Sequence, residues 1–415
     1  MSAFAQKRPA MPRLTRILIP LVLMAASVLF FFLALELALR ALDYPRREAR
    51  ILCLDAIMGN VYCPNLSEHL NNTYDSTLLV TTNREGMADR DYALEKPPGT
   101  IRIALLGDSV TASLYTKQEN KFKTIWETSL SQSLGRPVEV MNFGIDGTST
   151  WEQLQMFQLR ARHYKPDYVV LSFFWGNDIW NNSRSRNKGR PNPLKDEYGE
   201  QSWVRNLQVK HRKSIRWLWN NSSAFQFLDT LKDRLETSMD YKHAMQSAQT
   251  PGPAAAATPV TKLAEKSLDT PQPQTETALN LKLELEKRAH EFFIKLGDPA
   301  FSWDSESWEL TRELIIKLRD TALKNDARLI VFSIPMYDQL MLPKTLPYAE
   351  FRAFLQQSDI GSADAFDTLL GLSPEQKRAL YIGDAEHLSD QGHRLIGDTG
   401  ASALRRFIAR AAIKR

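Results

Sequence analysis

The stretch Ile101-Arg102-Ile103-Ala104-Leu105-Leu106-Gly107-Asp108-Ser109 determines how the rest of the sequence is interpreted. Apart from Arg102, the residues before Gly107 are apolar, which predicts a short buried strand. Gly107 ends the run, and apolar residues at helical spacing follow as far as Leu134. The stretch therefore predicts a strand that passes into a helix, with Ser109 at the junction.

The same alternation of strand and helix recurs along the chain. Further strands are predicted at residues 138–142, 168–174 and 328–334, and helices at 151–162 and 306–324. A last strand is predicted at Leu380-Tyr381-Ile382, before a final helix from about Gln391. Residues 168–174 are apolar almost throughout, as expected of a central parallel strand. This order of elements predicts an α/β fold with a parallel sheet that helices cover on both faces.

Three residues that follow predicted strands are candidates for a site. Ser109 is expected at the carboxyl end of the sheet, and its N–H at a helix start favours a developing oxyanion. Gly147 allows a ligand to approach the backbone closely. The amide of Asn177, in Gly176-Asn177-Asp178, can donate a hydrogen bond to a substrate oxygen. Taken singly, each is better explained as a turn or a helix cap. The Gly-x-Ser-x-Gly elbow of α/β-hydrolases is absent.

The fourth motif, Asp384-Ala385-Glu386-His387, follows the last predicted strand. A carboxylate at Asp384 can bond Nδ1–H of His387, which leaves Nε2 free to accept a proton from a serine hydroxyl. The alternative is a capping pair on the surface. His393 is expected to pack the last helix, because its spacing from His387 does not suit a helical metal site.

Together and in this order, the four motifs resemble those of the SGNH (GDSL) hydrolase family. The resemblance covers residues from about 84 to 182 and from 305 to 410. It implies a flavodoxin-like three-layer α/β/α sandwich. It also implies a triad of Ser109, His387 and Asp384, with an oxyanion hole formed by the N–H groups of Ser109 and Gly147 and the Asn177 amide. A member of this family is expected to need no metal and no cofactor.

The N-terminus predicts a membrane anchor. Basic residues precede an uncharged stretch from Ile17 to Leu35, which as a helix spans about 28 Å, close to the hydrocarbon thickness of a bilayer. The rival is a cleaved signal peptide, but the exit from Ala34 to Arg40 is a poor cleavage site. Basic residues flank the stretch on both sides, so charge alone does not fix its orientation. Glu36, Arg40 and the turn at residues 83–87 resemble single-pass members of the family. That resemblance implies a bacterial inner-membrane protein whose catalytic domain faces the periplasm.

The expected domain organisation follows from these segments. The predicted segments are a cytoplasmic N-terminus (1–16), a transmembrane anchor (17–38) and a connecting lobe (39–100). The hydrolase domain follows in two parts (101–180 and 305–415), with an insertion between them (181–304). The Pro, Ala, Thr and Gln content near residues 246–278 predicts a disordered linker. The basic and tryptophan-rich segment Lys210–Trp219 suits a membrane surface. A solvated basic face with packed tryptophans is the plainer alternative.

Composition argues against nucleic-acid binding and a metal cluster, and it leaves open whether the two cysteines form a disulfide. The chain has 53 Lys and Arg against 48 Asp and Glu, a net charge of +5, without the basic stripe that nucleic-acid binding requires. Cys53 and Cys63 are too few for a metal cluster. In an oxidising compartment they are able to form a disulfide, whereas in the cytosol they would remain thiols.

Three functions are compatible with the sequence. The first is a membrane-anchored serine esterase that removes ester groups, O-acetyl above all, from a cell-envelope polysaccharide. The second is an O-acyltransferase, in which a sugar hydroxyl replaces water. The third is a non-catalytic glycan-binding assembly protein, which the intact Ser109, Asn177 and His387 argue against. The expected partners are an ester or acylated glycan and membrane lipid; no protein partner is predicted.

Overall fold

The computed structural model describes residues 13–42, 51–55, 57–69, 78–184, 187, 191–195, 222–225, 227–228, 231, 303–341, 347–383 and 386–413. The chain forms two compact units, one of Met1–Arg50 with Lys210–Leu268 and one of Ile51–Val209 with Asp269–Arg415. The second unit contains the predicted hydrolase domain. The predicted linker at 246–278 and the segment Lys210–Trp219 lie outside the described residues.

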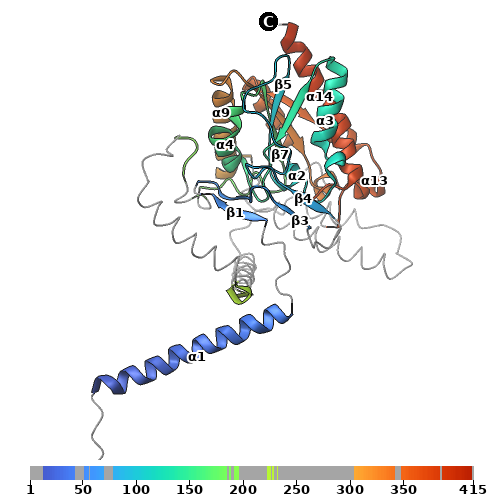
Figure 1. The fold of residues 1–415 in the computed structure, drawn as a ribbon. Helices are drawn as coiled ribbons and strands as arrows, with labels where there is room; N and C mark the ends of the chain where they lie inside the picture. The colour runs from blue at the N-terminus through green and yellow to red at the C-terminus, as the bar shows by residue number, and fades with distance from the viewer. Residues whose placement is uncertain are drawn as a thin grey trace, which may run out of the picture. The chain divides into compact units, whose positions relative to one another are not determined.

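A five-stranded parallel sheet forms the centre of the second unit (Figure 1). Its order is β6-β5-β7-β8-β9. The strands are β5 (Ile101–Leu106), β6 (Val138–Asn142), β7 (Tyr168–Phe174), β8 (Arg328–Ile334) and β9 (Gly361–Asp364). Every residue of β5 and of β7 is buried. Strands that are buried on both faces have to be apolar throughout, which is why the sequence shows them as continuous runs.

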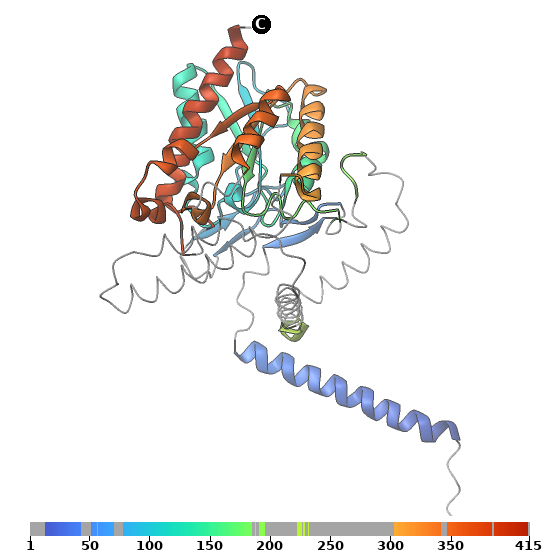
Figure 2. The same ribbon diagram turned by 180° about the vertical axis from the view of Figure 1, so that it is seen from behind.

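Helices cover both faces of this sheet (Figure 2). On one face α3 (Phe122–Leu134) contacts α14 (Asp390–Ile413), and on the other α4 (Thr150–Leu159) contacts α9 (Glu306–Leu323). Both α3 and α9 direct apolar residues three or four positions apart into the core, as amphipathic helices do. Shorter helices are α2 (Ser109–Ala112), η2 (Gln118–Asn120), η3 (Ala161–Tyr164), α10 (Tyr337–Met341), α11 (Tyr348–Gln357), α12 (Phe366–Leu370) and α13 (Pro374–Ala379).

The predicted α/β fold with a parallel sheet is confirmed, with β7 at its centre. Two details of the prediction are wrong. Residues 380–382 do not form the last strand, because Tyr381 makes only a single bridge to Leu388. The last strand is β9, whose Gly-Ser-Ala-Asp sequence has no apolar run because it lies at the edge of the sheet. The helix predicted at 151–162 ends at Leu159 and continues as the 3-10 turn η3.

Two small antiparallel hairpins precede the sheet in sequence. The first pairs β1 (Leu52–Asp55) with β2 (Gly59–Tyr62), and the second pairs β3 (Ser67–His69) with β4 (Leu79–Thr81). A disulfide joins Cys53 to Cys63 across the first hairpin. Figure 1 shows β1, β3 and β4 at the same end of the sheet as α2, the helix that begins with Ser109. The connecting lobe therefore has defined structure, which its weak periodicity did not indicate.

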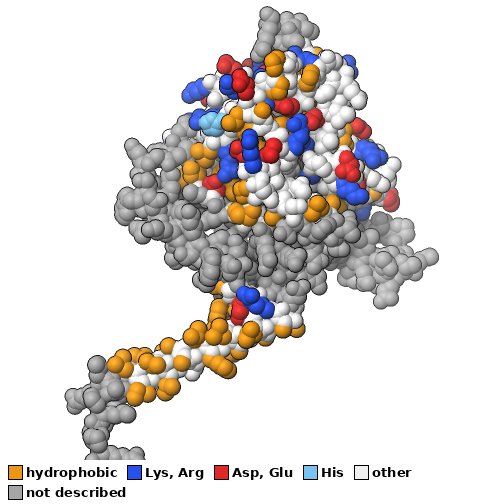
Figure 3. Space-filling view, viewed as in Figure 1, with side chains coloured by type: hydrophobic (Ala, Val, Ile, Leu, Met, Phe, Trp, Pro, Cys, Tyr) orange, Lys and Arg blue, Asp and Glu red, His pale blue; other side chains and the backbone are white. Residues whose placement is uncertain are grey.

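The first unit contains the N-terminal helix α1 (Arg13–Ala41). Its segment Leu18–Ala41 is long and apolar enough to cross a membrane, with a mean hydropathy of 2.7, although a signal sequence has the same properties. Its surface is apolar along most of its length (Figure 3). Near its end, Glu36 accepts hydrogen bonds from the Ser222 hydroxyl at 2.8 Å and the Ala224 N–H at 2.9 Å.

Candidate active site

Ser109 lies directly beyond the carboxyl end of β5. It is the first residue of α2, a helix of one turn that ends where Ser113 adopts a left-handed conformation (φ 55°). The preceding residue, Asp108, caps this turn by accepting the Val110 N–H at 3.0 Å. Because α2 is so short, its dipole contributes little. This geometry places the serine at the carboxyl end of the sheet, as the sequence predicted.

His387 reaches this serine from the other end of the chain. Its Nε2 lies 2.9 Å from Ser109 Oγ, a hydrogen-bond distance, although the residues are 278 positions apart. The loop that carries His387 is anchored by the Ile382 N–H, which donates to the His387 carbonyl at 2.9 Å. The ring of Tyr115 packs against the imidazole at a centroid distance of 4.6 Å. Asp384, the expected third member of the triad, lies outside the described residues.

The loop after β6 brings Gly147 to the same end of the sheet. Gly147 is exposed and has a φ of +70°, a conformation that favours glycine. The loop is held against the turn before Ser109: the Ile145 N–H and the Thr148 hydroxyl both donate to the Gly107 carbonyl, at 3.2 and 3.1 Å. The backbone N–H of Gly147 is thus carried by a loop that is tied to the nucleophile turn.

Asn177 lies in the turn after β7. The next residue, Asp178, fixes this turn through both carboxyl oxygens: Oδ2 accepts the Phe174 N–H at 2.8 Å and Oδ1 accepts the Gln153 side-chain amide at 3.0 Å. The Asn177 Oδ1 is buried and has no hydrogen-bond partner among the described residues. The turn therefore places Asn177 at the carboxyl end of β7, the strand next to β5.

Two carboxyls next to the site are fully buried. Asp108 and Asp178 both have 0% exposure. Burial raises the pKa of each, and the charge of Asp108 raises the pKa of Asp178 further. His393, expected to pack the last helix, is buried and stacks on Phe122. Burial lowers the pKa of His393 to about 3, so this imidazole is neutral in the folded protein.

The structure brings Tyr62, Tyr115 and Asp146 to the site, and none of them was predicted as a site residue. Tyr115 contacts His387, and the Tyr62 hydroxyl donates to the carboxylate of Asp146, the residue before Gly147. No motif marks these three residues. The only sequence signal is the position of Tyr62 beside Cys63, which indicates a fixed backbone once the disulfide is known.

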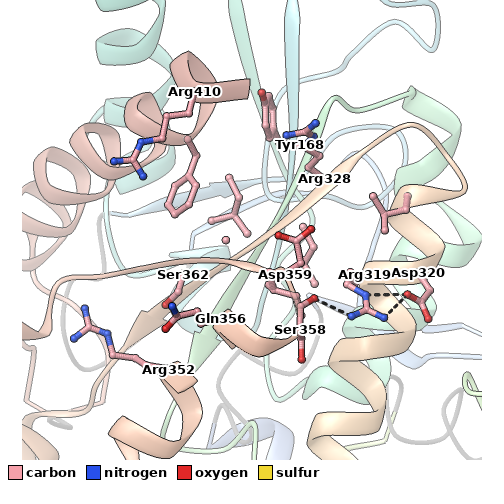
Figure 4. Close-up of a pocket in the computed structure, with 16 residues that line it drawn as sticks. Tyr168, Arg319, Asp320, Arg328, Arg352, Gln356, Ser358, Asp359, Ser362 and Arg410 are labelled. Carbon is pink, nitrogen blue, oxygen red and sulfur yellow. Dashed lines mark hydrogen bonds and ion pairs between the residues drawn. The ribbon is translucent and has the colours of Figure 1, made fainter. Parts of the chain in front are cut away.

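A large groove lies at the opposite end of the sheet. It is lined by the first residues of β7, β8 and β9, namely Tyr168, Arg328 and Gly361, and has a volume of about 1180 Å³ (Figure 4). Since the strands are parallel and Ser109 follows the last residue of β5, the groove is remote from the serine. Within the described part of the chain, no three His, Cys, Asp or Glu side chains are placed to hold a metal ion.

Comparison with known proteins gives one sequence match. The family model of the GDSL-like lipase/acylhydrolases matches residues 103–207. No curated protein matches the chain. Among solved structures, similarity is found to TesA (10% identity, 73% of this chain, 97% of that chain, TM-score 0.36). Similarity is also found to the psychrotrophic esterase EstA from Pseudoalteromonas sp. (10% identity, 74% of this chain, 98% of that chain, TM-score 0.36). A further similar structure is the acetyl xylan esterase AlAXEase (11% identity, 73% of this chain, 99% of that chain, TM-score 0.36).

The family match is more informative than these distant structural similarities. It covers the segment that holds Ser109, Gly147 and Asn177, on a parallel sheet whose serine lies within reach of a histidine. Residues 103–207 therefore belong to a GDSL-like lipase/acylhydrolase domain, and the chain is an ester-hydrolysing enzyme.

Proposed function

We propose that this protein is a membrane-anchored serine esterase that removes O-acetyl groups from a cell-envelope polysaccharide. The observation that carries the proposal is the 2.9 Å distance between Ser109 Oγ and His387 Nε2. A serine hydroxyl is a weak nucleophile unless a base accepts its proton, and an imidazole at this distance is such a base. Ser109 is the nucleophile, His387 the base, and Asp384 the carboxylate that orients His387.

The reaction proceeds in two acyl transfers. Ser109 Oγ attacks the ester carbonyl carbon while His387 Nε2 takes the hydroxyl proton. Nε2 then returns this proton to the departing sugar oxygen, which leaves an acetyl ester on Ser109. A water molecule gives its proton to Nε2 and attacks the acyl carbon. The proton then passes to Ser109 Oγ, and acetate is released.

The oxyanion of each tetrahedral intermediate needs fixed donors. The backbone N–H groups of Ser109 and Gly147 and the amide of Asn177 supply them in this proposal. Hydrogen-bond donors held in place before reaction stabilise the developing charge without further reorganisation. The ties from Ile145 and Thr148 to the Gly107 carbonyl, and from Asp178 to the Phe174 N–H, support such an arrangement because they restrain both loops.

Two features support a location in the bacterial inner membrane with the catalytic domain in the periplasm. The segment Leu18–Ala41 has the length and composition of a membrane span. The disulfide between Cys53 and Cys63 suits an oxidising compartment and not the cytosol. An enzyme anchored there would meet the acylated polysaccharides of the envelope.

The test is p-nitrophenyl acetate hydrolysis by the full chain in detergent, compared with Ser109→Ala. The matched control is Ser113→Ala, since Ser113 is buried on the same turn and bonds only backbone carbonyls in the described structure. We expect Ser109→Ala to abolish turnover and Ser113→Ala to retain it. Acetate release from acetylated polysaccharides then defines the substrate. Acetyl transfer to a glycan in excess of hydrolysis would contradict the esterase assignment, and turnover that survives Ser109→Ala would contradict the nucleophile.

A further inference from the structure

The phenol of Tyr62 holds the residue before Gly147 at two points. Tyr62 is the last residue of β2 and its side chain is fully buried. Its hydroxyl donates to Asp146 Oδ1 and accepts the backbone N–H of Asp146 at 3.1 Å. Both the side chain and the main chain of Asp146 are therefore bound to one rigid aromatic ring.

This contact bears directly on the proposed oxyanion donor. The N–H of Gly147 belongs to the peptide unit that joins Asp146 to Gly147. Gly147 has a φ of +70°, is exposed, and would have no atom within 4 Å of an added Cβ, so no side chain packs on that side of its backbone. The orientation of its N–H is set by the turn that the Thr148 N–H closes onto the Ile145 carbonyl at 3.3 Å, and by the contacts that hold Asp146.

The other side of the loop is tied to the nucleophile turn. Besides the bonds of Ile145 and Thr148 to the Gly107 carbonyl, Gly144 packs directly on α2: a Cβ at this position would lie 2.6 Å from the Ala112 nitrogen. The loop is thus bonded to the nucleophile turn through Ile145 and Thr148, and to the β1–β2 hairpin through Asp146 and Tyr62. Without Tyr62, the bonds from Ile145 and Thr148 to the Gly107 carbonyl remain, but none of the described hydrogen bonds holds Asp146.

Tyr62 itself is held by the hairpin. It pairs with Leu52 in the β1–β2 register, and the next residue, Cys63, is bonded to Cys53 and donates its N–H to the Ile51 carbonyl at 2.8 Å. Gly86 lies against the backbone of Tyr62, where a Cβ would be 2.3 Å from the Tyr62 carbonyl oxygen. The phenol therefore projects from a backbone that is fixed on both sides.

We propose that Tyr62 is a positioning residue of the active site, which holds Asp146 so that the Gly147 N–H points at the developing oxyanion. The inference deepens the proposed function and rests on it. It extends the catalytic machinery beyond residues 103–207 into the disulfide-bonded N-terminal lobe. Catalysis by an oxyanion hole depends on donors that are in place before the reaction, and small displacements of such groups are costly in rate.

The decisive variant is Tyr62→Phe, which removes the hydroxyl and keeps the ring. Its matched control is Tyr92→Phe. Tyr92 is also buried, and its hydroxyl also bonds a buried carboxyl, Asp89, at 2.9 Å, together with the Val140 carbonyl at 3.0 Å. Both variants lose a buried hydroxyl between an aromatic ring and a carboxyl, so both should lower the thermal midpoint by a similar amount. Only the first loses a contact to the loop of Gly147.

The quantities to be measured are kcat and KM for p-nitrophenyl acetate, with the full chain in detergent, and the rate at which a fluorophosphonate labels Ser109. Tyr62→Phe should lower kcat and the labelling rate by about 10- to 100-fold with KM changed less than about twofold. Tyr92→Phe should leave all three near wild type. Asp146→Ala should lower kcat similarly, and Tyr62→Phe/Asp146→Ala should be no slower than the slower single variant, because both remove one interaction.

Each outcome decides between the inference and the function on which it rests. If Tyr62→Phe keeps the wild-type kcat and labelling rate while Ser109→Ala is inactive, the inference is wrong and the serine esterase stands. Equal losses in Tyr62→Phe and Tyr92→Phe would also refute it, since Tyr62 would then act only through general stability. If the folded wild-type protein reacts with neither reagent, or Ser109→Ala retains activity, both proposals fail.

Discussion

Replacing His393 by leucine should make the hydrolase unit less sensitive to acid. His393 lies on α14, is 2% exposed and stacks on Phe122 with a centroid distance of 5.7 Å. Its Nδ1 has no hydrogen-bond partner among the described residues. Burial, aided by the positive charges of Lys121 and His387, lowers the pKa of His393 from 6.5 to about 3. A leucine retains the apolar packing and cannot take up a proton.

The direction of this pH effect follows from how many protons His393 binds in the folded and in the unfolded protein. Between pH 6.5 and about 3, the unfolded chain binds a proton at His393 that the folded protein does not bind. The stability due to the neutral imidazole is therefore fully present above pH 6.5 and is lost as the pH falls toward 3. Each unit of pKa difference is worth about 1.4 kcal/mol, so lowering the pH from about 7 to about 4 should cost about 3 kcal/mol through this residue.

The assay is urea unfolding of the full chain at pH 7, 6, 5 and 4, followed by fluorescence of the buried tryptophans Trp126, Trp175 and Trp308. The free energy of unfolding of His393→Leu relative to wild type should rise by about 3 kcal/mol from pH 7 to pH 4. His163→Leu is the control, because His163 is exposed, and it should follow the wild type at every pH. If His393→Leu shows the same pH dependence as wild type, the reasoning from burial is refuted.

Three further predictions concern the site and the lobe. Asn177→Ala should lower kcat by about 10²- to 10³-fold with an unchanged unfolding midpoint; a near-normal kcat would exclude Asn177 as an oxyanion donor. Asp178→Ala should cost about 2–3 kcal/mol in urea unfolding by leaving the buried Phe174 N–H unpaired, whereas Asp178→Asn, which keeps an acceptor, should cost less than half as much. Cys53→Ser/Cys63→Ser should cost about 2–3 kcal/mol, and an unchanged midpoint would show that the hairpin is held without its disulfide.

The elements that the sequence predicted well are those in which burial alone decides residue type. Strands β5 and β7 are buried at every position, so no polar residue interrupts them except Arg102 and Ser172. Arg102 is tolerated because its guanidinium pairs with Glu139 at 2.6 Å and bonds backbone carbonyls, Tyr164 at 2.9 Å among them. Edge strand β9 was missed for the opposite reason, since only Ala363 of its four residues is buried.

The two long-range contacts of the site differ in how far they could be foreseen. Ser109 and His387 are 278 residues apart, yet we predicted that they meet, because both motifs resemble blocks of the SGNH (GDSL) hydrolases and the serine follows a core strand. Tyr62 and Asp146 are only 84 residues apart and were not predicted. Tyr62 comes from a short hairpin without hydrophobic periodicity, and its position depends on tertiary packing against Gly86 and on the disulfide. Neither constraint has a pattern in the local sequence.

Asp108 and Asp178 lie next to the proposed oxyanion donors Ser109 and Asn177, where a negative charge on either aspartate would oppose the oxyanion. A carboxylate about 6 Å from an oxyanion would repel it by about 3 kcal/mol at an effective dielectric constant of 20, which would offset much of what an oxyanion donor contributes. Burial raises the pKa of both Asp108 and Asp178, and the nearby charge of Asp108 raises that of Asp178 further, so both carboxyls favour the neutral form more than an exposed aspartate does. A neutral carboxyl still accepts the Val110 or Phe174 N–H and fixes its turn. The two aspartates therefore shape the proposed oxyanion hole through hydrogen bonds, and their burial limits the charge that would oppose it.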